Sequence, residues 1–224
     1  MATIRVDGAA TRTVPPERAT VQVAAVSTGD AQAAVLSGAI SAHAAVIAAV
    51  EPLAASGAVG RWTAATVTLA TFREWVEQGV GEARTGSNVT RYRAAGAVEV
   101  EFTDLAAVGG FVTAVAAIDG VQIPGIAWSL TEATTAALTR EVRQEAARDA
   151  AERAATFADA YGLGSPVLER IDEGVSRFVG EPVPVGRAFA MKASFDAAGE
   201  SAGFDLRPGE ITVDTEVTAV FSAS

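Results

Sequence analysis

Acidic side chains in one polar stretch are the residues of this chain best suited to chemistry. Glu74, Glu77 and Glu82 lie close together in the sequence, and Glu99 and Glu101 follow further along. Paired carboxylates can transfer protons or hold a metal ion. Because no pair is marked as buried, a solvated acidic surface is the simpler interpretation. A hydrolase that uses these carboxylates is a minor alternative.

The chain has little else that could perform catalysis. His43 is the only histidine and there is no cysteine, so neither a catalytic triad nor a cluster of histidine and cysteine ligands can form. Gly81, Gly86 and Ser87 have the outer spacing of a phosphate loop, but the lysine is missing and strands are expected on both sides. The sequence therefore predicts a protein that is not an enzyme, with no catalytic residue, no cofactor and no metal site.

Large apolar residues form a second kind of candidate in the same region. Residues 61–76 and 88–103 are typical of two long strands, and the polar residues 79–87 between them are typical of a turn, so we expect a hairpin over residues 61–103. Its outer half carries four apolar residues. These are Phe72, Trp75, Val76 and Tyr92.

Two interpretations of these four residues are open. Trp75 and Tyr92 are expected near one another across the hairpin, and aromatic cross-strand packing is the simpler explanation. The alternative is an exposed patch, and contiguous exposed apolar surface usually marks an interface. We expect the hairpin to project beyond the core and to provide the contact of a homo-oligomer, together with an irregular segment at residues 174–206.

A long helix at residues 131–161 is expected to organise the elements around these candidates. The stretch contains no Gly and no Pro and is dense in strong helix formers. Thr131 is the expected N-cap and Gly162 the residue past the end. Asp149 and Arg153 have the spacing of a favourable ion pair on a helix. The expected inward stripe consists of Leu138, Val142, Ala146, Ala150, Ala154, Phe157 and Tyr161.

The remaining elements predict an α+β protein. Gly8 is expected to end a first short strand, Asp30 to cap a helix that ends near Pro52, and Asp104 to cap a second helix. The inward stripe of the Asp30 helix is expected to include Ile40. Strands and helices between residues 19 and 130 follow the βαββαβ order of ferredoxin-like units. An N-terminal strand, the long helix and C-terminal strands extend this core, and we expect a single domain over residues 1–224.

Composition narrows the classes of partner. The net charge is −10 over 224 residues, and a nucleic-acid-binding protein would usually carry a basic patch. The most apolar helical stretch, residues 31–55, is interrupted by Ser, His, Glu and Pro, so no membrane span is expected. The N-terminal residues lack a basic segment followed by an apolar run, which predicts a soluble, cytoplasmic protein as written. A periplasmic or surface location would follow if a leader had been removed.

Several short motifs, taken in order, resemble the SIMPL domain family. The resemblance covers nearly the whole chain. It depends on the order of the motifs, because most of them only mark turns and the ends of strands or helices. They are residues 4–8 (IRVDG), 14–19 (VPPERA), 120–123 (GVQI), 126–130 (IAWSL), 161–164 (YGLG) and 207–210 (RPGE).

The resemblance implies a bacterial protein that acts as a non-enzymatic oligomeric scaffold or binding protein linked to envelope or stress physiology. Some members of the family are periplasmic or surface-associated, and one assembles into a hollow oligomer. No catalytic residue is carried over from the family. The alternative function is a small-molecule or peptide-binding module with a pocket between the long helix and the sheet.

Overall fold

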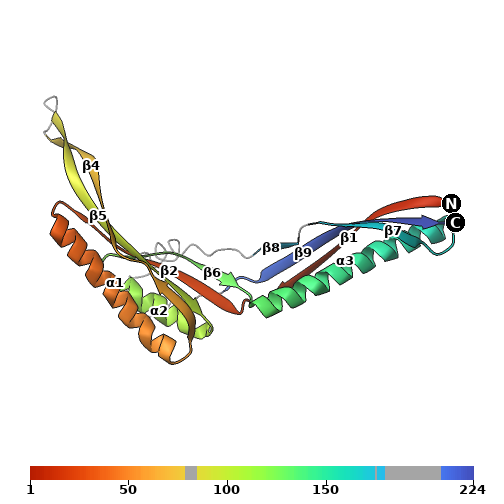
Figure 1. Cartoon of the computed structure of the whole chain (residues 1–224), viewed down its shortest axis with the longest axis horizontal. Coiled ribbons are helices and arrows are strands. Elements are labelled where there is room, and N and C mark those ends of the chain that lie inside the picture. Colours follow the sequence, from red (N-terminus) through yellow and green to blue (C-terminus); the bar gives the residue numbers. More distant parts are fainter. Residues whose placement is uncertain (79–84, 175, 180–207) are drawn as a thin grey trace, which may run out of the picture. The chain divides into compact units, whose positions relative to one another are not determined.

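The computed structural model describes residues 1–78, 85–174, 176–179 and 208–224. Its residues cluster into two compact units (Figure 1). The terminal unit contains the described residues of 1–17, 128–179 and 208–224, and the central unit contains those of 18–127. Mixed helices and antiparallel sheets confirm the predicted α+β class. The single domain over residues 1–224 stays a prediction.

The central unit is a sheet with two helices. Its elements run β2 (Arg18–Gly29), α1 (Gln32–Ala55), β3 (Val59–Ala64), β4 (Thr68–Gln78), β5 (Thr85–Phe102), α2 (Ala106–Ala116) and β6 (Val121–Ser129), and the last two residues of β6 group with the terminal unit. The sheet order is β3-β5-β2-β6, with β4 also paired to β5. Helix α1 packs on β2 and β5. The rings of Phe102 and Phe111 lie 5.3 Å apart in the core. The more specific ferredoxin-like assignment stays a prediction.

The predicted long strand at residues 61–76 is wrong, because the chain forms two strands there. Both β3 and β4 pair with β5, and their registers are Ala64↔Val98 and Thr68↔Ala95. Three residues, 65–67, therefore stand opposite two residues of β5. One extra residue on one strand is the defining feature of a β-bulge, which interrupts the hydrogen bonds between the two strands locally. No Gly or Pro occurs at 65–67, so local sequence gives no signal for it.

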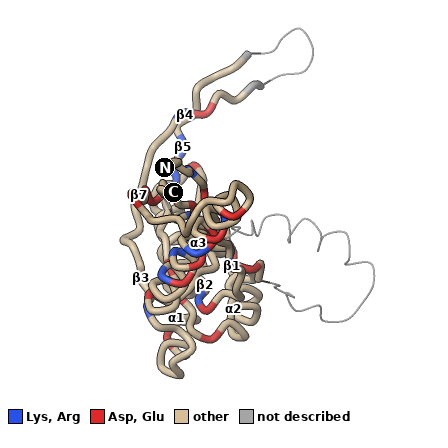
Figure 2. Tube along the Cα trace, turned by 90° about the vertical axis from the view of Figure 1, so that its right-hand side faces the viewer, with Lys and Arg blue, Asp and Glu red and all other residues tan. Residues whose placement is uncertain are grey.

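The terminal unit is a second sheet covered by the long helix. Its elements are β1 (Ala2–Val14), α3 (Glu132–Ala160), β7 (Val167–Glu173), β8 (Arg177–Val179) and β9 (Ile211–Ala223). The sheet order is β1-β9-β7, and β8 also pairs with β9. Acidic and basic residues are interspersed along α3 (Figure 2). The predicted irregular segment at residues 174–206 lies mostly outside the described residues.

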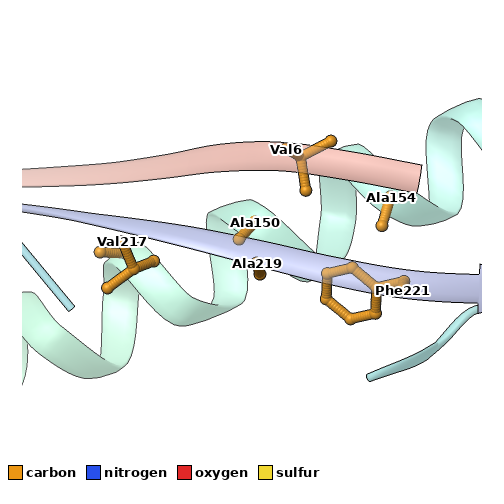
Figure 3. Packing of buried hydrophobic residues seen from close by; sticks show 7 residues of the cluster. Val6, Ala150, Ala154, Val217, Ala219 and Phe221 are labelled. Carbon is orange, nitrogen blue, oxygen red and sulfur yellow. The ribbon is translucent and has the colours of Figure 1, made fainter. Parts of the chain in front are cut away.

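The core of the terminal unit lies between α3 and alternate residues of β1 and β9. Val6 and Phe221 pack against Ala150 and Ala154 (Figure 3). The predicted inward face of the last strand is confirmed, since every second residue from Ile211 to Ala223 is buried. Small residues on α3 allow the helix to approach the sheet closely, because an alanine keeps little bulk between the two backbones.

Gly8 does not end the first strand, contrary to the prediction. It is buried in the middle of β1, directly against the backbone of α3. A Cβ built on Gly8 would lie 2.1 Å from the Ala146 carbonyl oxygen and 2.6 Å from the Ala150 nitrogen. Glycine is therefore required at this position because α3 packs too closely on β1 to leave room for a side chain. It does not mark a turn.

The inward stripe predicted for α3 is confirmed as far as Ala154 and wrong beyond it. Phe157 is 51 % exposed and Tyr161 is 80 % exposed, while Ala158 is buried. The stripe continues from Ala154 to Ala158 by a step of four residues, which suits the 3.6-residue turn. Phe157 consequently lies on the flank of the helix. The buried position of this turn is the small Ala158, and the bulkier Phe157 lies beside it.

Helix ends follow the predictions in part. The Thr134 N–H donates to Thr131 Oγ1 (3.2 Å), which confirms Thr131 as the cap of α3. Leu105 occupies the N-cap position of α2, and Asp104, predicted as the cap, lies one residue earlier, where its Oδ1 accepts from the first amide of the helix (3.0 Å). Asp30 is not the cap of α1, because the N-cap is Ala31 and the Asp30 carboxylate pairs with Arg91.

The predicted face of α1 is also partly wrong. Ile40 is 50 % exposed, and the buried positions are Val35, Ala39, Ala42, Val46 and Val50. Pro52 lies inside the helix instead of ending it. Among the described residues, α1 alone is long and apolar enough to cross a membrane by length and composition, a test that the core helix of a soluble protein also passes. The absence of a membrane span stays a prediction.

Candidate interface on the β4–β5 hairpin

The β4–β5 hairpin extends past the rest of its sheet. The pairing of β2 with β5 ends at Gly29↔Tyr92, whereas the pairing of β4 with β5 continues to Gln78↔Thr85. The pairs from Phe72↔Arg91 onward therefore belong to a ribbon of two strands, visible at the end of the hairpin in Figure 1. We call residues 72–78 and 85–91 the outer ribbon. The expectation that part of the hairpin projects beyond its sheet is confirmed for these residues.

The register divides the four predicted interface residues between two faces. Residues directly opposite one another on antiparallel strands point to the same side. Phe72 lies opposite Arg91, and Val76 lies on the same face as Phe72. Tyr92 lies opposite Thr71 on the other face, which it shares with Trp75. The four residues thus form no single patch.

Trp75 and Tyr92 are not cross-strand partners, contrary to the expectation. Trp75 pairs with Asn88, and its indole lies over Gly86, where an added Cβ would come within 2.1 Å of the ring. Tyr92 instead packs beside the buried side chains of Val35 and Ala39 on α1. Gly86 thus accommodates the indole, and Tyr92 belongs to the edge of the core.

Exposure separates the surface residues from the structural ones. Trp75 is 60 % exposed and Phe72 is 40 % exposed, while Val76 and Tyr92 are half-buried. The apolar surface open to solvent on the outer ribbon therefore consists mainly of Phe72 and Trp75, which lie on opposite faces. A partner that covered both residues would have to contact both faces of the ribbon, or two partner molecules would each have to contact one face.

One arginine orders the base of the outer ribbon. The Arg91 Nε–H donates to Glu74 Oε2 (2.7 Å), and Arg91 also pairs with Asp30 at the start of α1. The Arg91 side chain shares the Phe72 face and is about one quarter exposed. It ties both strands of the hairpin to the body of the central unit, which helps to hold Phe72 in place.

The carboxylates predicted as a minor catalytic possibility do not meet in one cleft among the described residues. Glu74 pairs with Arg91, and Glu101 lies 3.5 Å from an Arg61 nitrogen. Glu99 is exposed. Within residues 1–78, 85–174, 176–179 and 208–224, no group of three or more His, Cys, Asp or Glu could hold a metal ion. Glu82 and the side chain of Glu77 lie outside the described part of the structure.

His43 has a structural place on α1. It is half-buried, and its ring lies against Gly96 of β5, where an added Cβ would be 2.8 Å from His43 Cδ2. Its Nε2 is buried without a hydrogen-bond partner in the described part of the chain. Gly86 and Ser87 of the predicted glycine pattern lie in strand β5, and Gly81 lies outside the described residues.

A comparison with protein families gives the relationship of the chain. One family model, SIMPL, matches residues 4–221, nearly the whole chain. The chain belongs to the SIMPL family. This confirms the resemblance that the order of motifs indicated. SIMPL is described as a protein of unknown function (DUF541), so membership brings no assigned activity. No curated protein matches the chain.

Sequence reasoning missed one surface altogether. Phe157 and Tyr161 of the terminal unit were expected in the core but are exposed beside strand β1. No local signal distinguishes them from core residues, because their spacing suits the buried stripe nearly as well as its flank.

Proposed function

We propose that this SIMPL protein is a non-enzymatic scaffold or binding protein that assembles into a homo-oligomer through its outer ribbon. The observation that carries the proposal is a two-stranded ribbon with Phe72 and Trp75 exposed on its two faces. An isolated two-stranded hairpin is marginally stable in water. A second copy that covered the ribbon would stabilise it and remove the two aromatic side chains from solvent.

The chemistry of the ribbon suits contact with a like surface. Burying the exposed part of Phe72 or Trp75 contributes on the order of 1 kcal/mol per side chain. The ribbon contains two basic residues, Arg73 and Arg91, and two acidic residues, Glu74 and Glu77, so the acidic charge of the whole chain is not concentrated there. Repetition of the same contact by symmetry multiplies a small gain per subunit.

The wider physiological role rests on the family resemblance. A link to envelope or stress physiology belongs to the proposal, and no nucleic-acid partner is expected for a chain of net charge −10. The cytoplasmic location expected for the chain as written is testable by fractionation of cells that produce the natural protein.

Light scattering after size-exclusion chromatography tests the proposal. The double variant Phe72→Ser, Trp75→Ser is compared with the wild type at about tens of micromolar, since association depends on concentration. We expect the wild type to be oligomeric and the double variant to have a lower mass. Ile40→Gln is the matched control, because Ile40 is a half-exposed apolar residue of the same unit away from the ribbon. A double variant that keeps the wild-type mass would exclude the ribbon as the contact.

A further inference from the structure

Strand β1 lies at one edge of the described sheet of the terminal unit. Among the described strands it pairs only with β9. The Ala9 N–H points away from β9, because it donates to Asp149 Oδ2 (2.9 Å). Backbone groups on an antiparallel strand alternate between its two edges, so the N–H and C=O groups of Thr3, Arg5 and Asp7 also point outward. No described strand pairs with these groups.

A groove runs along this open edge beside helix α3. Two adjoining cavities of about 420 Å³ and about 610 Å³ share Arg5 and Phe157 in their linings. The first is also lined by Arg153 and Thr156 of α3, and the second by Tyr161. We call residues 2–7 of β1 with Arg153, Thr156, Phe157, Tyr161 and Leu163 the β1 groove. An open strand edge next to a helix is the arrangement that accepts an extended peptide by strand addition.

The residues on the two faces of β1 determine which side chains a bound peptide would need on each of its own faces. Ile4 and Val6 lie opposite the buried Phe221 and Ala219, so they point to the α3 side (Figure 3 shows Val6). Arg5 lies opposite Val220 on the other face and forms no ion pair among the described residues. Neighbouring residues of an added strand would therefore alternate between the apolar groove and the Arg5 guanidinium.

We propose that the β1 groove binds an extended segment of another protein with the pattern apolar, acidic, apolar. The acidic side chain pairs with Arg5, and the apolar side chains on either side of it enter the groove against Phe157 and Tyr161. The part of β1 that can bind a strand ends before Ala9, because the Ala9 N–H already donates to the Asp149 carboxylate. Thr3 to Asp7 then span roughly 17 Å of strand, enough for about five residues of the partner.

Charge and register disfavour a second copy of β1 in this place. When two open edges pair in antiparallel fashion, each residue whose backbone N–H and C=O point to the open edge stands opposite another residue of this kind. Arg5 opposite Asp7 of a second copy matches the charges, but it also places Thr3 of that copy against Ala9, whose N–H is taken. Arg5 opposite Arg5 sets like charges face to face, which is destabilising. Arg5 opposite Thr3 leaves the guanidinium unmatched. The groove lies in the terminal unit, so this inference is independent of the outer ribbon.

Fluorescence anisotropy of a labelled, end-blocked peptide, Ser-Leu-Glu-Leu-Thr-Ser, tests the proposal on the full chain. The same peptide with Lys in place of Glu is the comparison. We expect the Glu peptide to bind more tightly, Arg5→Glu to reverse this preference, and Phe157→Ser to weaken binding roughly tenfold or more. Ile171→Ser on β7, at the opposite edge of the sheet, is the matched control and should leave binding unchanged.

Two further measurements keep the outcome decisive. Arg5→Pro removes an outward N–H on an edge strand, a position where Pro is tolerated, and it should abolish binding while the circular dichroism spectrum stays native. Absence of binding by both peptides, or equal binding by all variants, would overturn the proposal. A fall in the mass of the protein on Phe157→Ser would show that a second copy occupies the groove, and would also overturn it. Loss of peptide binding at unchanged mass leaves the ribbon proposal untouched.

Discussion

Replacing Gly8 by alanine should destabilise the terminal unit far more than one methyl group suggests. The new Cβ would lie 2.1 Å from the Ala146 carbonyl oxygen and 2.8 Å from the Ala150 Cβ. Ordinary contacts of a Cβ begin near 3.4 Å, so α3 and β1 must separate by about 1 Å over this turn. The atoms in the way belong mainly to the helix backbone, and no flexible side chain can move aside. Overpacking of a close-packed core costs about 1–3 kcal/mol, and we expect the upper end of that range.

Urea unfolding followed by circular dichroism measures the effect, because a shift of the midpoint at constant slope reports stability. Gly110→Ala is the matched control. Gly110 lies inside α2, and an added Cβ there meets nothing within 4 Å. That substitution should stabilise the protein by about 0.5–1 kcal/mol, since Gly is a poor helix former. An unchanged midpoint for Gly8→Ala would refute the close contact of α3 with β1.

Two predictions concern other residues of α3. Phe157→Ala should lower the free energy of unfolding by about 1 kcal/mol or less, because half of the ring is already exposed and the large cost of emptying a core site does not apply; a loss of about 3 kcal/mol in urea would show that the ring is buried. The Ala9 N–H, and then Arg153, hold the pKa of Asp149 below its ordinary value. The resulting stabilisation is complete above the unfolded pKa of about 3.9 and is lost as the pH falls through the lower folded pKa. Asp149→Asn should therefore be less stable than the wild type at neutral pH, and the two urea midpoints should converge as the pH falls through the lowered folded pKa of Asp149; a constant difference between them would contradict the assignment.

The parts of the fold that could be predicted are those that leave a local pattern. Thr131 caps α3 through its hydroxyl, and the long run without Gly or Pro gave the helix nearly to its last residue. The alternation in β9 gave its buried face. Both patterns depend on neighbours within a turn or two of the chain, so they are visible without knowing what packs against them.

The parts that could not be predicted depend on contacts between distant residues. Gly8 has the local appearance of a strand end, and only the position of α3 shows why it is needed. The break at residues 65–67 follows from the register against β5.

Only part of the candidate surface could be predicted, because Val76 and Tyr92 are half-buried. Phe72 and Trp75 are exposed as expected, yet they lie on opposite faces of the ribbon. The face of each residue depends on register, and a shift of one residue would invert it. The β1 groove follows from the order of strands in the sheet, which hydrophobic periodicity does not contain.

The mass of the unmodified protein in solution tests the central claim most directly. One chain has a mass of 22.8 kDa. Light scattering at about tens of micromolar, a concentration at which a specific contact of modest affinity is populated, should give a mass that is a multiple of this value. A mass of a single chain under these conditions would contradict assembly through the outer ribbon.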